Sequence, residues 1–497
     1  MNNLPQQILQ MGQKKDVIKN SFFYTIGNLL LKAFSFFLIP LYTSYLSPEQ
    51  YGILNLANSF SSVLTMVFMM GLQYSVIRFF ADYKEDRGKV AKMFGTVICF
   101  ILAIGVSISG ILILLRNHWS IFVFENISFF PVVLLAILIS VVHGLYTVYQ
   151  DILKGMQDAK RSILLTYLFF FLMLGSNIYT VVGLKMGASG ILYSTLFVNT
   201  IMLVLMFIDL YKRHLFVLTI DKTILKELLK YSLPLVPHTM AYTISNYATR
   251  LVISNKMSLS MLGVYSLASQ FGNLGDVILN SIQSAFQPWM FNRMNDTDEK
   301  KADDIAKTSY MLMWVYGLFF ILIGVFSQEA IILMASESYI EAWIYVPFIV
   351  LSIAIKSPMY FYNNFLYYDK SQTKYLFHIT VISSIICIII TFLLVPRLGI
   401  FGAIIASIIS LIIRLILILR IVSNVAKNYY SLIKLHLLFV IPMILMGIAL
   451  IPSYTIFKTS FSFFNVVYKI LICIAYMLIM YVLYKKQIKH YLRKISK

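Results

Sequence analysis

The sequence predicts an all-α polytopic membrane protein with about 14 transmembrane helices, in which two parallel six-helix repeats form two lobes and two further helices follow at the C-terminus. Three observations predict this fold: apolar runs long enough to cross a bilayer, basic residues concentrated on one side, and an internal repeat. Of the 497 residues, 59% are hydrophobic and only 12% are charged, whereas soluble domains carry about 25% charged residues. This composition excludes a soluble enzyme and, with three cysteines, a disulfide-stabilised secreted scaffold.

The apolar runs are the first observation. A helix needs about 20 apolar residues to cross a hydrocarbon core of about 30 Å. Runs near this length occupy residues 21–45, 52–75, 92–115, 128–149, 162–183, 187–210, 233–255, 260–287, 309–328, 342–366, 376–395, 399–419, 434–453 and 464–484. They are continuous rather than alternating, which indicates helices and not barrel strands. No cleavage-site pattern follows the first run, so we expect an uncleaved membrane helix there.

The distribution of basic residues is the second observation. With the N-terminus in the cytoplasm, the predicted cytoplasmic segments hold 31 of the 41 lysines and arginines. The predicted outside segments hold six: Arg116, Lys185, Lys256, Arg397, Lys458 and Lys469. This asymmetry predicts a multi-pass protein of the bacterial cytoplasmic membrane with both termini cytoplasmic. It also accounts for the net charge of +20 without nucleic acid, and we expect the basic C-terminal tail to contact membrane lipids.

The internal repeat is the third observation. Two blocks coincide after shifts of 211 or 212 residues. The coinciding pairs are Ser47/Ser258, Gly52/Gly263, Leu56/Leu267, Ala57/Ala268, Phe60/Phe271, Gly187/Gly399 and Gly190/Gly402. Because the shift spans an even number of helices, both halves have the same orientation, and a substrate path is expected between them. We divide the chain into an N-terminal lobe (1–210), a C-terminal lobe (211–425) and two extra helices with a basic tail (426–497).

The sequence lacks the common signatures of catalysis. It contains no phosphate-binding ATPase loop and no HExxH or CxxC pattern, so we expect neither a metal site nor a cofactor. The predicted outside loops are too short to form an external active site. Transport is therefore favoured over an enzymatic activity such as polymerase or ligase chemistry.

Ionisable residues inside the apolar runs indicate the functional site. They are Lys32, Arg250, Asp276, Lys356 and Arg414. Each costs about 2.5–3.5 kcal/mol at the centre of a bilayer, so they must face water, one another or a charged ligand. Four of the five are cationic, which favours an anionic cargo such as a diphosphate, whose oxygens an arginine can bind in bidentate fashion.

We assign Lys32, Arg78, Arg250 and Lys356 to a cavity that binds a substrate diphosphate. Each has a structural alternative. Arg250 lies near the outer end of its run and could reach the interface. Lys356 stands beside Pro358 and could satisfy carbonyls freed by a kink. Arg78 lies at a cytoplasmic helix end and could be an orientation signal.

Two further candidates concern coupling and motion. Asp276 is the single acid in the interior of an apolar run, away from its ends, and it either binds a coupling ion or neutralises Arg250. Pro40, Pro234 and Pro237 lie in repeat-related helices, where kinks would allow each half to open and close. The alternative is a packing kink without a role in gating.

Several segments resemble the Wzx-type flippases of the multidrug/oligosaccharidyl-lipid/polysaccharide (MOP) exporter superfamily. The most specific is Ile39-Pro40-Leu41-Tyr42-Thr43-x-Tyr45-Leu46-Ser47-Pro48-Glu49-Gln50-Tyr51-Gly52. Weaker ones are Leu262-Gly263-Val264-Tyr265-Ser266-Leu267-Ala268, Ala285-Phe286-Gln287-Pro288-Trp289 and Tyr339-Ile340-Glu341-Ala342-Trp343. The resemblance covers residues 15–430.

This resemblance implies a V-shaped, two-lobed flippase for undecaprenyl-diphosphate-linked oligosaccharide repeat units. Such a protein moves its cargo from the inner to the outer leaflet for O-antigen, capsule or exopolysaccharide synthesis. It also implies alternating access, coupling to H⁺ or Na⁺, and a polysaccharide polymerase as a partner. Lys32, Arg78 and Arg250 loosely match basic residues of the family cleft. The acid that drug-exporting relatives carry in helix one is missing here. A peptidoglycan-precursor flippase and a multidrug/cation antiporter of the same superfamily remain alternatives.

Overall fold

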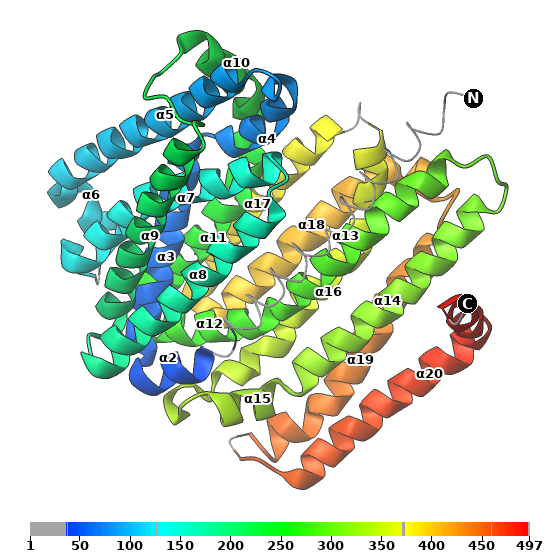
Figure 1. Ribbon diagram of the computed structural model, residues 1–497. Coiled ribbons are helices and arrows are strands. Elements are labelled where there is room, and N and C mark those ends of the chain that lie inside the picture. The colour runs from blue at the N-terminus through cyan, green and yellow to red at the C-terminus, as the bar shows by residue number, and fades with distance from the viewer. Residues whose placement is uncertain (1–35, 37, 126, 370–372, 459, 496–497) are drawn as a thin grey trace, which may run out of the picture. The chain divides into compact units, whose positions relative to one another are not determined.

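The computed structural model describes residues 36, 38–125, 127–369, 373–458 and 460–495. These residues form helices joined by short connections, and the described ranges contain no strand (Figure 1). Lys32 and most of the first predicted run lie outside the described residues. Contacts divide the chain into two units, Met1–Asn255 and Lys256–Lys497.

The first unit is built from helices α2 to α11. Their bounds are α2 (Ile39–Tyr45), α3 (Pro48–Met69), α4 (Leu72–Tyr83), α5 (Arg87–Leu114), α6 (Arg116–Val123), η1 (Phe129–Val133), α7 (Leu134–Gly155), α8 (Ala159–Asn177), η2 (Ile178–Gly183), α9 (Gly187–Lys212), α10 (Lys222–Ser232), η3 (Leu233–Leu235) and α11 (Val236–Lys256). Helix α7 is central, because it packs against α3, α4, α5 and α9.

The second unit is built from helices α12 to α20. Their bounds are α12 (Leu259–Gly272), α13 (Leu274–Asn295), α14 (Lys301–Val325), α15 (Ser327–Met334), η4 (Glu337–Tyr339), α16 (Ala342–Tyr368), α17 (Thr373–Leu398), α18 (Ile400–Ala426), α19 (Leu432–Thr455) and α20 (Phe463–Ile495). Helix α16 is central here and packs against α12, α14 and α18. Figure 1 shows α14, α19 and α20 side by side, and these helices contact one another.

Eleven helices of the described part are long and apolar enough to cross a membrane. The protein is therefore a polytopic all-α membrane protein, as predicted, while the count of 14 stays a prediction. The predicted run at 233–255 corresponds to η3 and α11. Helix α11 is not among the eleven, because its serine, threonine and asparagine side chains make it too polar. The run at 260–287 was wrongly predicted as one helix: α12 ends at Gly272 and α13 begins at Leu274.

The run at 52–75 is also two helices, because the backbone turns between α3 and α4. Met70 and Gly71 both have positive φ, at 46° and 74°, a conformation that glycine adopts without steric cost. A Cβ at Gly71 would lie 3.1 Å from the carbonyl oxygen of Ser232. Gly71 therefore allows both the turn and the close approach of the α10–η3 junction.

The internal repeat is visible in the element bounds. Helices α6 (116–123) and α15 (327–334) differ by 211 at both ends, and α5 and α14 end at Leu114 and Val325, also 211 apart. Ser47 and Ser258 each cap the helix that follows, with the hydroxyl oxygen accepting from a backbone N–H at 3.3 and 3.1 Å. Gly187 and Gly399 both have φ of 60°. The helices from α3 to α9 and those from α12 to α18 thus follow one order.

The grouping by contacts differs from the division of the sequence. Residues 211–255 fall in the first unit, whereas we assigned them to the C-terminal lobe. The last two helices, assigned to a region of their own (426–497), pack within the second unit. The lobe boundaries themselves stay a prediction.

Gly95 on α5 allows close packing of the connection before α10. A Cβ at Gly95 would overlap the carbonyl oxygen of Val217, whereas a Cβ at Gly110 on the same helix would meet nothing within 4 Å. We expect Gly95→Ala to lower the free energy of unfolding by about 1–3 kcal/mol and Gly110→Ala to raise it by about 0.5–1 kcal/mol. Thermal unfolding of the detergent-solubilised protein measures both, and equal effects would contradict this packing.

Candidate functional site

A polar pocket lies between α3 and α11 in the first unit. Its volume is about 300 Å³, and every residue that lines it is polar or charged: Asn55, Asn58, Ser59, Ser62, Tyr242, Thr243, Asn246 and Arg250. The four α3 residues follow the spacing i, i+3, i+4 and i+7, which places them on one face of the helix. Among the described lining residues there is no carboxylate.

Arg250 is held in this pocket by α3. Its Nη1 donates to the Ser59 hydroxyl oxygen at 2.7 Å, and that hydroxyl donates to the carbonyl oxygen of Asn55 at 2.7 Å. The Arg250 Nε is buried without a hydrogen-bond partner among the described residues. The guanidinium group therefore lines a polar pocket and is bound there by a neutral hydroxyl.

Aromatic rings surround the α3 turn that carries Ser59. Phe60 is 8% exposed, and its ring centroid lies 5.7 Å from Trp119, 5.1 Å from Phe124 and 5.8 Å from Tyr247. Such aromatic pairs contribute about 0.5–1.5 kcal/mol each beyond the area they bury. They stabilise the packing of α3 next to the residues that line the pocket.

An ion pair joins α13 to α16 in the second unit. Lys356 Nζ lies 2.8 Å from Asp276 Oδ2, and both side chains are 20% exposed. Of the two expectations for Asp276, pairing with a cation is met by Lys356 rather than by Arg250. Lys356 likewise gains a carboxylate partner, and its assignment to a diphosphate stays a prediction.

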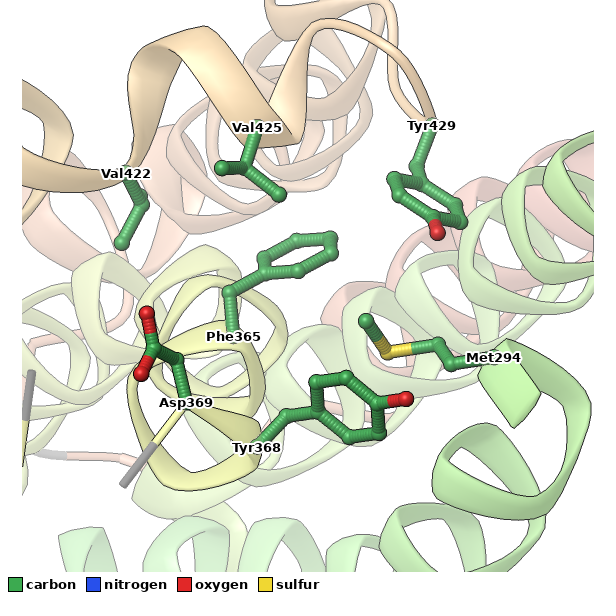
Figure 2. Close-up of a pocket in the computed structure, with 7 residues that line it drawn as sticks. All are labelled: Met294, Phe365, Tyr368, Asp369, Val422, Val425 and Tyr429. Carbon is green, nitrogen blue, oxygen red and sulfur yellow. The ribbon is translucent and has the colours of Figure 1, made fainter. Parts of the chain in front are cut away.

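A second pocket lies at the ends of α13, α16 and α18, with a volume of about 590 Å³. Its lining is Met294, Phe365, Tyr368, Asp369, Val422, Val425 and Tyr429 (Figure 2). The rings of Phe365 and Tyr429 are 5.3 Å apart, and the Tyr368 hydroxyl donates to Asn295 Oδ1 at 2.5 Å. None of the predicted site residues lines this pocket.

Residues 17–294 match the model of a family described as polysaccharide biosynthesis protein. The match covers more than half of the chain. The chain belongs to this family. Its relatives include the "Lsg locus putative protein 1" of Haemophilus influenzae, which is 20% identical over 411 residues, covering 78% of this chain and 95% of that protein.

Solved structures establish the fold of this polysaccharide biosynthesis family member. The lipid II flippase MurJ in an inward closed conformation has a TM-score of 0.71 at 16% identity and covers 94% of this chain and 99% of its own. An inward-facing MATE multidrug resistance transporter of the MOP superfamily has a TM-score of 0.64 at 15% identity and covers 81% and 99%. At this level of identity the two likenesses show that the chain has the fold of these proteins.

Arg78, a further predicted site residue of this family member, lies in the same unit but does not line the α3–α11 pocket. Arg78 on α4 is 53% exposed and pairs with Asp82 one turn later at 2.7 Å. Helix α4 packs on α10, where Tyr83 donates to Glu227 at 2.7 Å, and burial raises the pKa of Tyr83 to about 12. Arg78 thus lies in the middle of α4 with an exposed side chain that pairs with a carboxylate of the same helix.

The three prolines lie at helix starts. Pro40 is in the first turn of α2, Pro234 is in η3, and Pro237 is the second residue of α11. In these positions proline removes no helical hydrogen bond. The change from the 3₁₀ turn η3 to α11 marks a local change of helix type, and the gating role of all three prolines stays a prediction.

The sequence missed a buried ion pair in the second unit. Lys469, which we assigned to an outside segment, lies in the second turn of α20 and its side chain is 0% exposed. Its Nζ lies 2.6 Å from Glu329 Oε1 on α15. No local signal reveals this pairing, because the two residues are 140 positions apart.

The described residues contain no cluster of three or more metal-ligating side chains.

Proposed function

We propose that this protein is a flippase that moves undecaprenyl-diphosphate-linked oligosaccharide repeat units from the inner to the outer leaflet of the bacterial cytoplasmic membrane. Its product would serve O-antigen, capsule or exopolysaccharide synthesis. The observation that carries the proposal is the Arg250 pocket, in a chain that belongs to a polysaccharide biosynthesis family. In the proposed mechanism the cargo site opens alternately to the two sides of the membrane, and transport is coupled to an ion gradient.

The chemistry of the pocket supports this cargo. The guanidinium of Arg250 is suited to phosphate oxygens, because it presents several N–H donors in one plane. The amides of Asn55, Asn58 and Asn246 both donate and accept hydrogen bonds, as sugar hydroxyls do. With no carboxylate among its described lining, the pocket offers no counter-charge to a cationic drug. This favours a lipid-linked saccharide over the multidrug/cation antiporter.

The peptidoglycan-precursor flippase is the second candidate. It is supported by the fold likeness to a protein titled lipid II flippase. Lipid II also combines a diphosphate with sugars, so the Arg250 pocket suits both cargoes. The family match to polysaccharide biosynthesis proteins favours the repeat unit as the cargo.

A leaflet-protection assay tests the proposed function. Purified protein is placed in phosphatidylcholine/phosphatidylglycerol vesicles that carry fluorescent undecaprenyl-diphosphate-N-acetylglucosamine, and dithionite is added outside to quench the exposed leaflet. We expect the protein to expose the inner-leaflet probe that protein-free vesicles protect. Equal rates with fluorescent lipid II would favour the second candidate, and transport of a cationic dye alone would overturn the proposal.

The proposal also includes the topology and a partner. Both termini would lie in the cytoplasm, and a polysaccharide polymerase would receive the cargo on the outer side. Reporter fusions at residue 497 and in the predicted outside segment at Lys185 test the topology, because a cytoplasmic reporter is active only at the first site. Activity at both sites or at neither would contradict it.

A further inference from the structure

The connection between α9 and α10 presents apolar side chains outward. Val217, Leu218 and Ile220 are 45%, 82% and 46% exposed, in a segment that the proposed topology places on the cytoplasmic side. A group of exposed aliphatic side chains marks a surface that binds lipid or another protein. The connection is therefore a candidate interaction surface of the first unit.

This connection is packed against α5. Val217 lies over Gly95, where a Cβ would overlap its carbonyl oxygen, and the backbone N–H of Asp221 donates to the Thr96 hydroxyl oxygen at 3.0 Å. Gly95 and Thr96 lie near the start of the apolar run at 92–115, in a helix that is long and apolar enough to cross a membrane. The exposed apolar side chains are thus held at the edge of the membrane-crossing part of α5.

Helix α10, which follows the connection, carries lysines on one face. Lys222, Lys226 and Lys230 are spaced four residues apart, which places them on one side of the helix, and all three are exposed. Ile224 and Leu228 lie on the opposite side of the helix and are 6% and 0% exposed, in packing with α4 and α5 (Figure 1). Helix α10 is therefore amphipathic, with its basic face turned outward.

The acidic residues of this helix and its start are engaged by other groups. Asp221 Oδ1 accepts from the backbone N–H groups of Thr223 and Ile224 at 2.9 and 3.1 Å. Glu227 Oε2 accepts from the Tyr83 hydroxyl at 2.7 Å. The ion pairs of the described residues include none of the three α10 lysines. The basic face of α10 thus complements an external anion.

We propose that α10 and the connection 214–221 bind anionic phospholipids of the adjacent leaflet, with phosphatidylglycerol as the headgroup tested below. The three lysines contact the headgroup phosphates, and Leu218 enters the acyl region beside α5. A lysine close to an anionic membrane surface strengthens binding by about 5-fold. A lipid surface is favoured over a soluble anion, because a soluble anion offers no apolar contact to Leu218.

The inference goes beyond the proposed function, because it concerns the lipids around the protein and not the transported one. Helix α10 continues through η3 into α11, the helix that carries Arg250. Lipid binding at α10 would therefore hold the start of α11 at the membrane surface. This gives the connection before α11 a role in addition to joining two helices.

Photo-crosslinking in vesicles tests the proposal. Full-length protein is placed in phosphatidylcholine vesicles with a trace of phosphatidylglycerol or phosphatidylcholine that carries a photoreactive acyl chain, and cross-linked peptides are identified by mass spectrometry. We expect the phosphatidylglycerol probe to label residues 214–232 on the order of 10-fold more than the phosphatidylcholine probe. The variant K222Q/K226Q/K230Q should lose this preference. Leu218→Asn should lower labelling by both probes about 3-fold or more, because it removes an inserted apolar side chain.

Two matched variants serve as controls. K185Q/K256Q/K458Q removes three exposed lysines outside this surface and gives the same net charge as the triple variant, so the preference should remain. Leu333→Asn changes a leucine of α15 that is 76% exposed and should leave labelling of residues 214–232 unchanged. All variants are compared at equal insertion into the vesicles.

Four outcomes would overturn the inference. They are equal labelling of residues 214–232 by the two probes in wild type, an unchanged preference in the α10 triple variant, an equal loss in the charge control, and no effect of Leu218→Asn. Absence of labelling by either probe would also overturn it and would indicate a soluble anionic partner. The readout requires no transport, so its result is independent of whether the protein moves the proposed cargo.

Discussion

Replacing Arg250 by alanine is expected to reduce flipping of fluorescent undecaprenyl-diphosphate-N-acetylglucosamine by on the order of 10- to 100-fold. Arg250 is the single cation among the described residues lining the α3–α11 pocket. A hydrogen bond to a charged group contributes about 1.5–3 kcal/mol, and each 1.4 kcal/mol corresponds to about a factor of ten. The leaflet-protection assay measures the rate for variants that insert into vesicles to the same extent as wild type.

Two further variants define the role of Arg250. Arg250→Lys keeps the charge but loses the planar set of donors, so we expect an intermediate rate. Arg213→Ala is the matched control: it removes a partly buried arginine of the same unit that pairs with Asp158 at 3.2 Å, outside the pocket. A wild-type rate in Arg250→Ala, or an equal loss in Arg213→Ala, would contradict the assignment of Arg250 to the cargo.

Replacing Lys469 by methionine is expected to destabilise the protein by about 3–5 kcal/mol, because it leaves the Glu329 carboxylate buried without its counter-charge. Lys469 also lies 3.3 Å from Gln328 Oε1, and Asn465 donates to Ser453 at 3.0 Å in the same cluster. This cluster joins α15, α19 and α20. Thermal and denaturant unfolding in detergent measure the loss of stability.

The double variant E329Q/K469M separates the charge from the packing. It removes both charges, so we expect it to be nearly as stable as the wild type and more stable than Lys469→Met. The reason is that a whole buried ion pair can often be replaced by uncharged residues at little cost in stability. Lys458→Met changes an exposed lysine of the α19–α20 connection and serves as the control. A small effect of Lys469→Met, or no recovery in the double variant, would show that the ion pair does not hold α20 in place.

Features that depend on neighbouring residues are encoded locally, although two of them were not among our predictions. The polar face of α3 follows from the spacing of Asn55, Asn58 and Ser62, and the start of α3 follows from Ser47 and Pro48, a capping residue and a proline in the first turn. The repeat was also readable, because repeated segments keep their capping serines and the glycines at left-handed positions.

The breaks within helices were less predictable. Apolar runs continue through Met70–Gly71 and through Gly272–Asn273, so hydropathy alone joins each pair of helices into one. The break after α3 is stabilised by the approach of α10, which is distant in sequence and thus leaves no local signal.

What the sequence alone determined is that helices cross a membrane, that they are built twice in the same order, and that a few charges lie where lipid does not tolerate them. Only the tertiary structure decided how these charges are satisfied, Asp276 by Lys356 and Arg250 by a neutral hydroxyl, and only it revealed the pair of Glu329 and Lys469. The physical reason is that burial depends on composition along one helix, whereas a partner depends on how two distant helices are rotated against each other. That rotation is set by the packing of the whole unit.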